Sequence, residues 1–350
     1  MFLNNYIDIS NCQQNEKYYG GLSCLKMGVT LDNVDYIVKL PGNLKDKNLR
    51  NVILSYSNAP ICEYIGSHIY ESLGIKVHDT TLATYNGKVV VLCKDFLNYG
   101  DTLYEFRQIK STYPKGFLTK TGEASDGTGS DLDEALIVIR DHIAFKKLTK
   151  FEDHFWNMFI VDAIIGNGDR NNGNYGIIQN GNSSCIAPVF DNGNCLNPTW
   201  DDNKMKKALI SKDASEIYRG KTCFFTRDDK KLNPFQIIAS GEFEACSIAL
   251  DRIINMFNLD YVDEMIDAIK YASSTQKEWY KYIIRARIDY LKTIDISTIK
   301  EMHTYANVHF LDYQDLIGRI YRDMPTMYKT STDKEICAMQ YWNKWKELQI

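Results

Sequence analysis

The sequence predicts an α+β fold of two lobes, a small β-rich lobe with one helix followed by a larger helical lobe. Two observations support this prediction. Most of the first hundred residues form short runs of β-branched and aromatic residues that end at turn signals, as strands do. From Leu132 onward, apolar residues recur instead at helical spacing. We expect the boundary near residues 95–100, which gives lobes of residues 1–97 and 98–350.

The small lobe is expected to contain four strands and one helix. The strands cover residues 22–30, 35–40, 77–85 and 89–94. Pro41-Gly42 stops the second strand, and Asn86-Gly87 between the last two strands is a strong signal for a β-hairpin. Over residues 58–73 an apolar residue recurs at every fourth position and Gly74 follows, which predicts a helix that ends in a glycine cap.

The large lobe is expected to be mostly helical. The predicted helices cover residues 133–149, 152–165, 243–257, 260–272, 276–291 and 333–348. Residues 166–200 differ, because Gly, Asn and Asp interrupt two short apolar runs at 175–178 and 186–190. This pattern predicts a loop, a hairpin and a second loop inserted between helices.

Composition excludes several classes of protein. The chain has 350 residues with 41 Lys and Arg against 45 Asp and Glu, and its net charge of −4 gives no cationic field that would draw nucleic acid. Nine cysteines form no C-x-x-C pair and six histidines form no H-x-x-x-H pair, which disfavours zinc sites of those spacings. No basic leader and no apolar run of about 20 residues occurs. We expect a cytoplasmic protein with reduced thiols, without a membrane span or direct nucleic-acid contact.

Two polar clusters are the strongest candidates for chemistry. Asp169 is followed five residues later by Asn174, and Asp191 closes the next predicted hairpin. Phosphoryl transfer needs a carboxylate that orients the acceptor hydroxyl and oxygen ligands for Mg²⁺. Each cluster alone is more typical of a structural turn than of a catalytic site, because Asn, Gly and Asp are common turn residues. The two together, at hairpin spacing behind a β-rich lobe, favour phosphoryl transfer.

The small lobe offers a cation for the phosphates of a nucleotide. Lys39 is the one charged residue near the end of the strand YIVKL, although a lysine there is usually an exposed residue of a strand edge. Glu63 lies on the following helix and is a candidate partner for Lys39. Helical arithmetic places Glu63 outside the apolar stripe, so an exposed surface glutamate is an open alternative.

These segments resemble a known family. Residues 165–176, IGNGDRNNGNYG, resemble the I-G-N-x-D-R-H-x-x-N-[FW]-G catalytic segment of HipA-type serine/threonine kinases. Residues 187–193, APVFDNG, are similar to the A-P-x-[FY]-D metal-binding segment of that family. The resemblance extends over roughly residues 18–260 and is strongest to compact, CtkA-type members, which lack the extra N-terminal domain of HipA.

The resemblance implies a protein-kinase-like fold with ATP between the lobes and a role for each matching residue. Asp169 would be the catalytic aspartate, and Asn174 and Asp191 would bind Mg²⁺. Lys39 would contact the ATP phosphates, with Glu63 as its partner. Asn171 stands where the family usually has histidine, which puts the local geometry of the loop in doubt.

The resemblance also implies where the remainder of ATP binds. Backbone groups of Leu92, Cys93 and Asp95 would meet the adenine ring at the hinge between the lobes. A short Gly/Ser loop before the first strand would cover the phosphates through Gly21 and Ser23. Members of this family can autophosphorylate in that loop, which makes Ser23 a candidate autophosphorylation site.

We therefore expect a Mg-ATP-dependent serine/threonine protein kinase that phosphorylates a protein hydroxyl and autophosphorylates. Two alternatives stay open at this point. A small-molecule phosphotransferase of the same fold would use the same core residues, and a nucleotide-binding pseudokinase would need no intact set of them. The expected partners are a protein substrate with a Ser or Thr acceptor and, by kinship with HipA, an antitoxin-like regulator.

Overall fold

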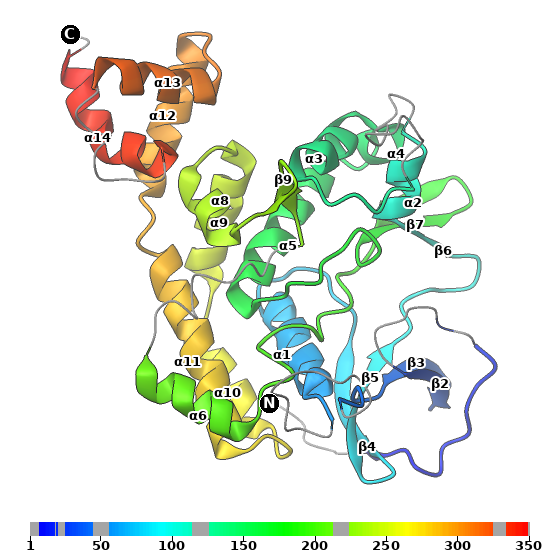
Figure 1. Cartoon of the computed structure of the whole chain (residues 1–350). Helices are drawn as coiled ribbons and strands as arrows, with labels where there is room; N and C mark the ends of the chain where they lie inside the picture. The colour runs from blue at the N-terminus through cyan, green and yellow to red at the C-terminus, as the bar shows by residue number, and fades with distance from the viewer. Residues whose placement is uncertain are drawn as a thin grey trace.

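The computed structural model describes residues 7–17, 19, 25–44, 56–113, 126–212, 224–324 and 334–348. Figure 1 shows a sheet-bearing lobe with one helix packed beside it and a larger lobe built mostly of helices. This arrangement is the predicted one. Among the described residues, no helix combines the length and apolar character needed to cross a membrane.

The small lobe is a five-stranded sheet in the order β1-β4-β5-β3-β2. The strands are β1 (Ile7–Asp8), β2 (Lys26–Leu31), β3 (Val34–Lys39), β4 (Thr80–Tyr85) and β5 (Lys88–Lys94). The hairpin predicted at Asn86-Gly87 is present, and β2 and β3 form another. Asp32 and Asn33 join β2 to β3, and Asn86 and Gly87 join β4 to β5, all with positive φ, as tight hairpin turns require. The antiparallel pairing of β3 with β5 sets Lys39 opposite Val91 near the centre of the sheet.

Helix α1 (Ala59–Ser72) packs on this sheet and links the two lobes. Its residues Ile61, Ile65 and Ile69 are buried, as their spacing predicts. Gly74 follows the helix with a φ of 67°, a backbone conformation that suits glycine. Glu63 is only 1 % exposed, so it is not the exposed surface residue that helical arithmetic left open. It lies between the sheet and the large lobe, where its carboxylate contacts Lys39 of β3 and the backbone N–H of Asn192.

The large lobe contains more helices than the sequence predicted. They are α2 (Phe106–Ser111), α3 (Leu132–Asp141), α4 (Ile143–Lys146), α5 (Phe151–Ile165), α6 (Asp202–Ser211), α8 (Pro234–Ser240), α9 (Glu244–Met256), α10 (Leu259–Ala268), α11 (Ser274–Leu291), α12 (Ile296–Val308), α13 (Tyr313–Asp323) and α14 (Lys334–Leu348). Helices α2, α6, α8, α12 and α13 lie outside the predicted ranges.

Two predicted elements differ from the structure in more than their end residues. The helix expected over 133–149 is interrupted at His142, which adopts an extended backbone and caps α4 by accepting a hydrogen bond from the Ala144 N–H. The strand expected over 186–190 lies earlier, as β8 (Ser183–Ile186), paired with β7 (Gly176–Asn180). Strand β6 (Thr102–Glu105) was not predicted and completes this second sheet in the order β6-β7-β8.

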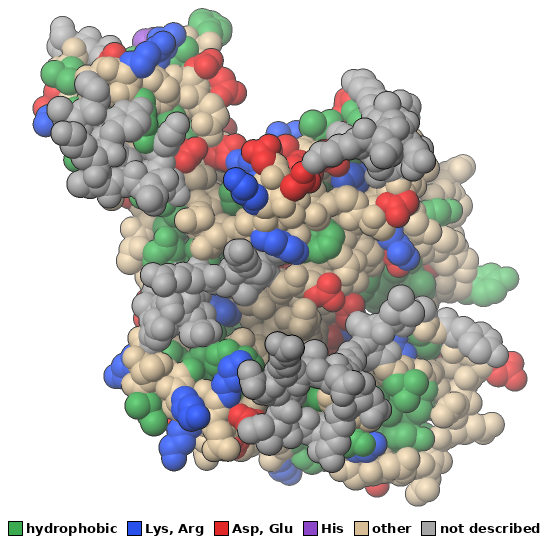
Figure 2. Space-filling model, in the orientation of Figure 1, with side chains coloured by type: hydrophobic (Ala, Val, Ile, Leu, Met, Phe, Trp, Pro, Cys, Tyr) green, Lys and Arg blue, Asp and Glu red, His purple; other side chains and the backbone are tan. Residues whose placement is uncertain are grey.

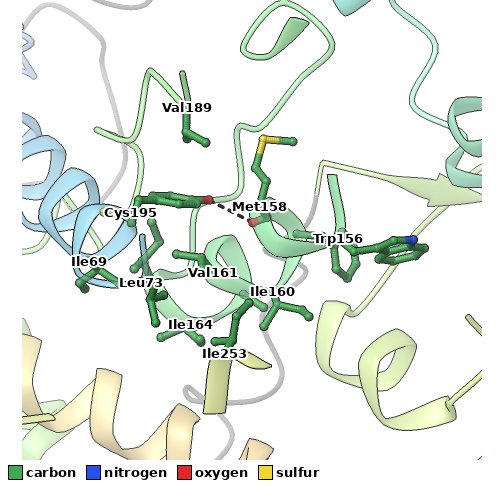
Figure 3. Close-up of a cluster of buried hydrophobic side chains, with 14 of the residues drawn as sticks. Ile69, Leu73, Trp156, Met158, Ile160, Val161, Ile164, Val189, Cys195 and Ile253 are labelled. Carbon is green, nitrogen blue, oxygen red and sulfur yellow. Dashed lines mark hydrogen bonds between the residues drawn. The ribbon is translucent and has the colours of Figure 1, made fainter. Parts of the chain in front are cut away.

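Helix α5 lies at the centre of the main core, because its sequence is apolar on nearly every side. Figure 3 shows Ile69 of α1, Leu73 directly after this helix and Ile253 of α9 gathered around Val161 and Ile164 of α5. The packing anchors the start of the loop that follows α5, which carries the first polar cluster.

The last three helices have an apolar cluster of their own. It is built around Leu316, Trp342 and Trp345, and in Figure 1 these helices stand at one end of the large lobe. Two hydrogen bonds attach these helices to the end of α8. His303 Nε2 bonds the backbone carbonyl of Gly241, which follows α8, and the Tyr313 hydroxyl donates to the carbonyl of Ser240, the last residue of α8.

Candidate active site

A cavity of about 670 Å³ opens between the two lobes. Lys39, Asp169, Asn174 and Asp191 line its polar end. The apolar part is lined by Ile37, Phe96, Leu97, Leu103 and Phe190. Figure 2 shows acidic side chains in the hollow between the lobes. With Cys93 and Asp95, six of the predicted functional residues line this cavity, and they come from both lobes.

Lys39 connects the two lobes at the polar end of this cavity. Its Nζ lies 2.8 Å from Glu63 Oε2 and 2.7 Å from Asp191 Oδ1, although Asp191 is 152 positions away in the sequence. Burial alone would lower the pKa of Lys39, but the two carboxylates raise this pKa well above its ordinary value. Burial alone would raise the pKa of Glu63 and of Asp191, but Lys39 holds each pKa below its usual range. All three groups are therefore charged at neutral pH.

Asp191 is held in an uncommon backbone conformation. Its φ is 62°, in the left-handed region that few residues other than glycine adopt, and such strain persists only where the surroundings fix it. The next residue, Asn192, donates its backbone N–H to Glu63 Oε1 at 2.8 Å. The preceding carbonyl, of Phe190, accepts a hydrogen bond from Arg170. The Asp191 carboxylate is thus aimed into the cavity by contacts on both sides.

Arg170 is a buried hub that sequence reasoning did not single out. Its Nε and Nη2 donate to the two oxygens of Asp162 at 2.8 and 3.0 Å, which raises the pKa of Arg170 above its usual range despite burial. The same guanidinium donates to the backbone carbonyl of Asn174 at 3.2 Å and to Asn192 Oδ1. One side chain therefore ties the Asp169 loop to the Asp191 segment. The sequence signal for this network was Asp162, the one charged residue in the apolar stretch 155–165.

The loop after α5 orients Asp169 through its own asparagines. Asn171 donates from Nδ2 to Asp169 Oδ1 at 3.1 Å, so the residue found in place of the family histidine contacts the candidate catalytic carboxylate. Asn174 donates from Nδ2 to the Asp169 backbone carbonyl at 2.7 Å. This bond turns the Asn174 amide oxygen away from that carbonyl and leaves it as the end suited to a metal. A carboxylate and an amide oxygen are donors that Mg²⁺ accepts, so Asp191 and Asn174 fit this ion.

The residues predicted for the hinge divide into two groups. Cys93 and Asp95 line the cavity, but the Leu92 side chain is buried in the small-lobe cluster and does not. The Asp95 backbone N–H already donates to the Asp35 carbonyl at 2.9 Å. Tyr19, which was not predicted, also lines the cavity and donates its hydroxyl hydrogen to Asp95 Oδ2 at 3.1 Å.

The residues predicted to cover the ATP phosphates are not among those that the structure describes. Gly21 and Ser23 lie outside the described residues. The described segments before and after them pair with each other. Gln14 forms a β-bridge with Val29, and the Asn15 N–H donates to the Gly28 carbonyl.

Comparison with known proteins finds a similar sequence and a similar solved structure. No family model matches the chain. The chain is 34 % identical over 298 residues to the serine/threonine-protein kinase CtkA of Helicobacter pylori, an alignment that covers 83 % of this chain and 87 % of the relative. The crystal structure of the H. pylori proinflammatory kinase CtkA matches with a TM-score of 0.72 at 31 % identity, over 82 % of this chain and 98 % of that one.

A more distant structural match is HipA of Shewanella oneidensis, solved with HipB and its operator DNA. Its TM-score is 0.51 at 11 % identity, over 83 % of this chain and 70 % of that one, so it shows a shared fold alone. The matches to both solved structures confirm the predicted two-lobed fold.

Proposed function

Because the chain belongs to the CtkA-type, HipA-like serine/threonine protein kinases, we propose that Lys39, Asp169, Asn174 and Asp191 form its catalytic centre. As a kinase of this family it uses ATP and acts on a protein. The observation that carries the proposal is the contact of Lys39 with both Glu63 and Asp191 at the polar end of the cavity between the lobes.

Each residue of the centre has a distinct task. Asp169 accepts a hydrogen bond from the acceptor hydroxyl and orients its oxygen toward the γ-phosphorus. Lys39, held in place by Glu63, offsets charge on the ATP phosphates. Asp191 and Asn174 would hold Mg²⁺, which supplies further positive charge to the phosphates. The apolar part of the cavity, with Cys93 and Asp95 at its edge, would take the adenine ring.

The proposed lobes of residues 1–97 and 98–350 divide this work. The small lobe supplies Lys39 and Glu63, and the large lobe supplies Asp169, Asn174 and Asp191. The proposed boundary is supported by the sheets, because β5 ends the first sheet and β6 begins the second. An antitoxin-like regulator stays a prediction, since the likeness to HipA extends to the fold alone.

Replacing Asp191 with asparagine tests the proposed metal site. We expect the affinity for ATP in the presence of Mg²⁺ to fall by at least about tenfold, because a charged ligand is lost. Titration of a fluorescent ATP analogue with Mg²⁺, and again with a chelator, measures this. The matched control is Asp79→Asn, whose carboxylate is 72 % exposed. If Asp191→Asn gained as much affinity from Mg²⁺ as the wild type, the metal would lie elsewhere.

Autophosphorylation at Ser23 is a second testable part of the proposal, supported by the family resemblance of the Gly/Ser loop. Peptide mass mapping after incubation with Mg²⁺ and ATP is expected to find one phosphate on the peptide that contains Ser23. A Ser23→Ala variant should lack that phosphate. Phosphate confined to other peptides would refute this assignment without affecting the catalytic centre.

A further inference from the structure

A second group of metal-ligand side chains lies beside Lys39. Glu63, His78 and Cys93 each offer one ligand atom, and these atoms lie within 4.8 Å of one another. The three residues are 1, 4 and 0 % exposed, so they form a built cluster and not a chance gathering of surface groups. His78 and Cys93 also line the large cavity, which gives an ion a route to the cluster.

Three separate elements hold these ligands in place. Glu63 comes from α1 and Cys93 from β5, which pack against each other in the main core. His78 precedes β4, and its backbone N–H donates to the Val189 carbonyl at 3.0 Å. Its Nε2 lies 3.0 Å from Glu63 Oε1 and 3.2 Å from Ser67 Oγ. Ligands on rigid elements keep their positions without a metal, as a preformed site requires.

The donor set selects a class of metal. An imidazole nitrogen, a thiolate sulfur and a carboxylate oxygen are the ligands that Zn²⁺ takes, and three of them leave a fourth position open. Mg²⁺ and Ca²⁺ prefer oxygen ligands alone. We propose that Glu63, His78 and Cys93 form a binding site for Zn²⁺ or a similar borderline transition-metal ion, separate from the Mg²⁺ ligands Asp191 and Asn174.

Charge balance favours such an ion. With Cys93 as a thiol and His78 as the neutral imidazole that metal binding requires, the positive charge of Lys39 faces the two carboxylates of Glu63 and Asp191, which leaves one negative charge in excess. Zinc binding releases the Cys93 proton to solvent, because the thiolate is the ligand. The two charges of the ion then cancel both the thiolate and the excess carboxylate charge. The buried cluster becomes neutral, which lowers the cost of burying its charges.

Zinc binding has a consequence for ATP. The ion would compete with Lys39 for Glu63, whose Oε2 now lies 2.8 Å from Lys39 Nζ. An ammonium group repelled from Glu63 is no longer held toward the phosphates. By linkage, zinc and ATP then weaken the binding of each other by the same factor. This inhibitory effect rests on the proposed role of Lys39, whereas metal binding itself does not.

Cobalt(II) serves as a spectroscopic probe of the site in the full-length protein. We expect wild-type protein titrated with Co²⁺ to show a thiolate-to-cobalt charge-transfer band in the near ultraviolet and the intense visible bands of tetrahedral coordination. Cys93→Ser should lose the thiolate band, and His78→Gln should bind Zn²⁺ at least about tenfold more weakly in competition with a chromogenic chelator. Cys185→Ser removes an exposed thiol from β8 and is the matched control. A wild-type spectrum without the thiolate band, or one retained by Cys93→Ser, would overturn the site.

Kinase assays test the inhibitory consequence separately. Zn²⁺ should raise the apparent KM for ATP of wild type and of Cys185→Ser, and a chelator should reverse the rise. For Cys93→Ser, Zn²⁺ should leave the apparent KM for ATP at the value that the same variant shows without zinc. Cobalt binding at Cys93 with an unchanged KM in Zn²⁺ would overturn the inhibition. Absence of activity in zinc-free wild-type protein would instead count against the proposed function.

Discussion

An Asp169→Asn variant is expected to transfer phosphate about 10²–10⁴ times more slowly than the wild type, the effect typical of losing a positioned proton acceptor. The asparagine amide has the same shape as the carboxylate but cannot accept the hydroxyl proton. Asp169 is partly exposed and its carboxylate accepts a side-chain bond from Asn171, so the change leaves the core untouched. Folding and ATP affinity should therefore be retained.

Steady-state rates, thermal unfolding and ATP titration of the variant check each part of this expectation. Asp153→Asn is the control, because that carboxylate is 50 % exposed on α5 and is not among the residues that line the cavity. A fall in kcat with unchanged unfolding supports the catalytic role. Wild-type turnover by Asp169→Asn would remove Asp169 from the mechanism.

Arg170→Met is expected to give the largest loss of stability, about 3–5 kcal/mol, because it leaves the buried Asp162 carboxylate without its cation. Both side chains are less than a tenth exposed, so water cannot replace the lost contacts. Activity should fall as well, since Arg170 supports the carbonyls and side chains on either side of Asp191. Urea unfolding measures the free energy.

The matched control for this change is Arg252→Met. Arg252 is 39 % exposed and donates to Asn157 at 2.6 Å, and removing such a surface contact is expected to cost less than about 1 kcal/mol. If the two variants unfolded at the same urea concentration, the Arg170 network would not be what holds the two active-site segments together.

Sequence alone predicted the parts of the fold that depend on local signals. The regular spacing of Ile61, Ile65 and Ile69 predicts α1, and Asn86-Gly87 predicts the second hairpin, because turn chemistry and helical periodicity are properties of neighbouring residues. The break at His142 was missed, since a side-chain cap competes there with an apolar pattern that continues on both sides. Helices α12 and α13 were missed although α13 is amphipathic.

Contacts between distant segments could not be predicted in the same way. Lys39 and Asp191 were candidates for one site because of their residue types and the family resemblance, yet their contact depends on how the lobes close. The spacing of Arg170 and Asp162 in the sequence does not indicate that they link the Asp169 loop to the Asp191 segment. The zinc-ligand set of Glu63, His78 and Cys93 comes from three elements, so a search for paired histidines or paired cysteines at fixed spacing passes over it.

The most direct test of the central claim is a phosphate balance in one reaction. Purified protein is incubated with Mg²⁺, ATP and a protein acceptor rich in serine and threonine, and the ADP formed is compared with the phosphoserine and phosphothreonine formed. We predict equal amounts for the wild type and almost none of either for Asp169→Asn. ADP without phosphorylated protein, or equal protein phosphorylation by Asp169→Asn, would contradict a protein kinase that acts through Asp169.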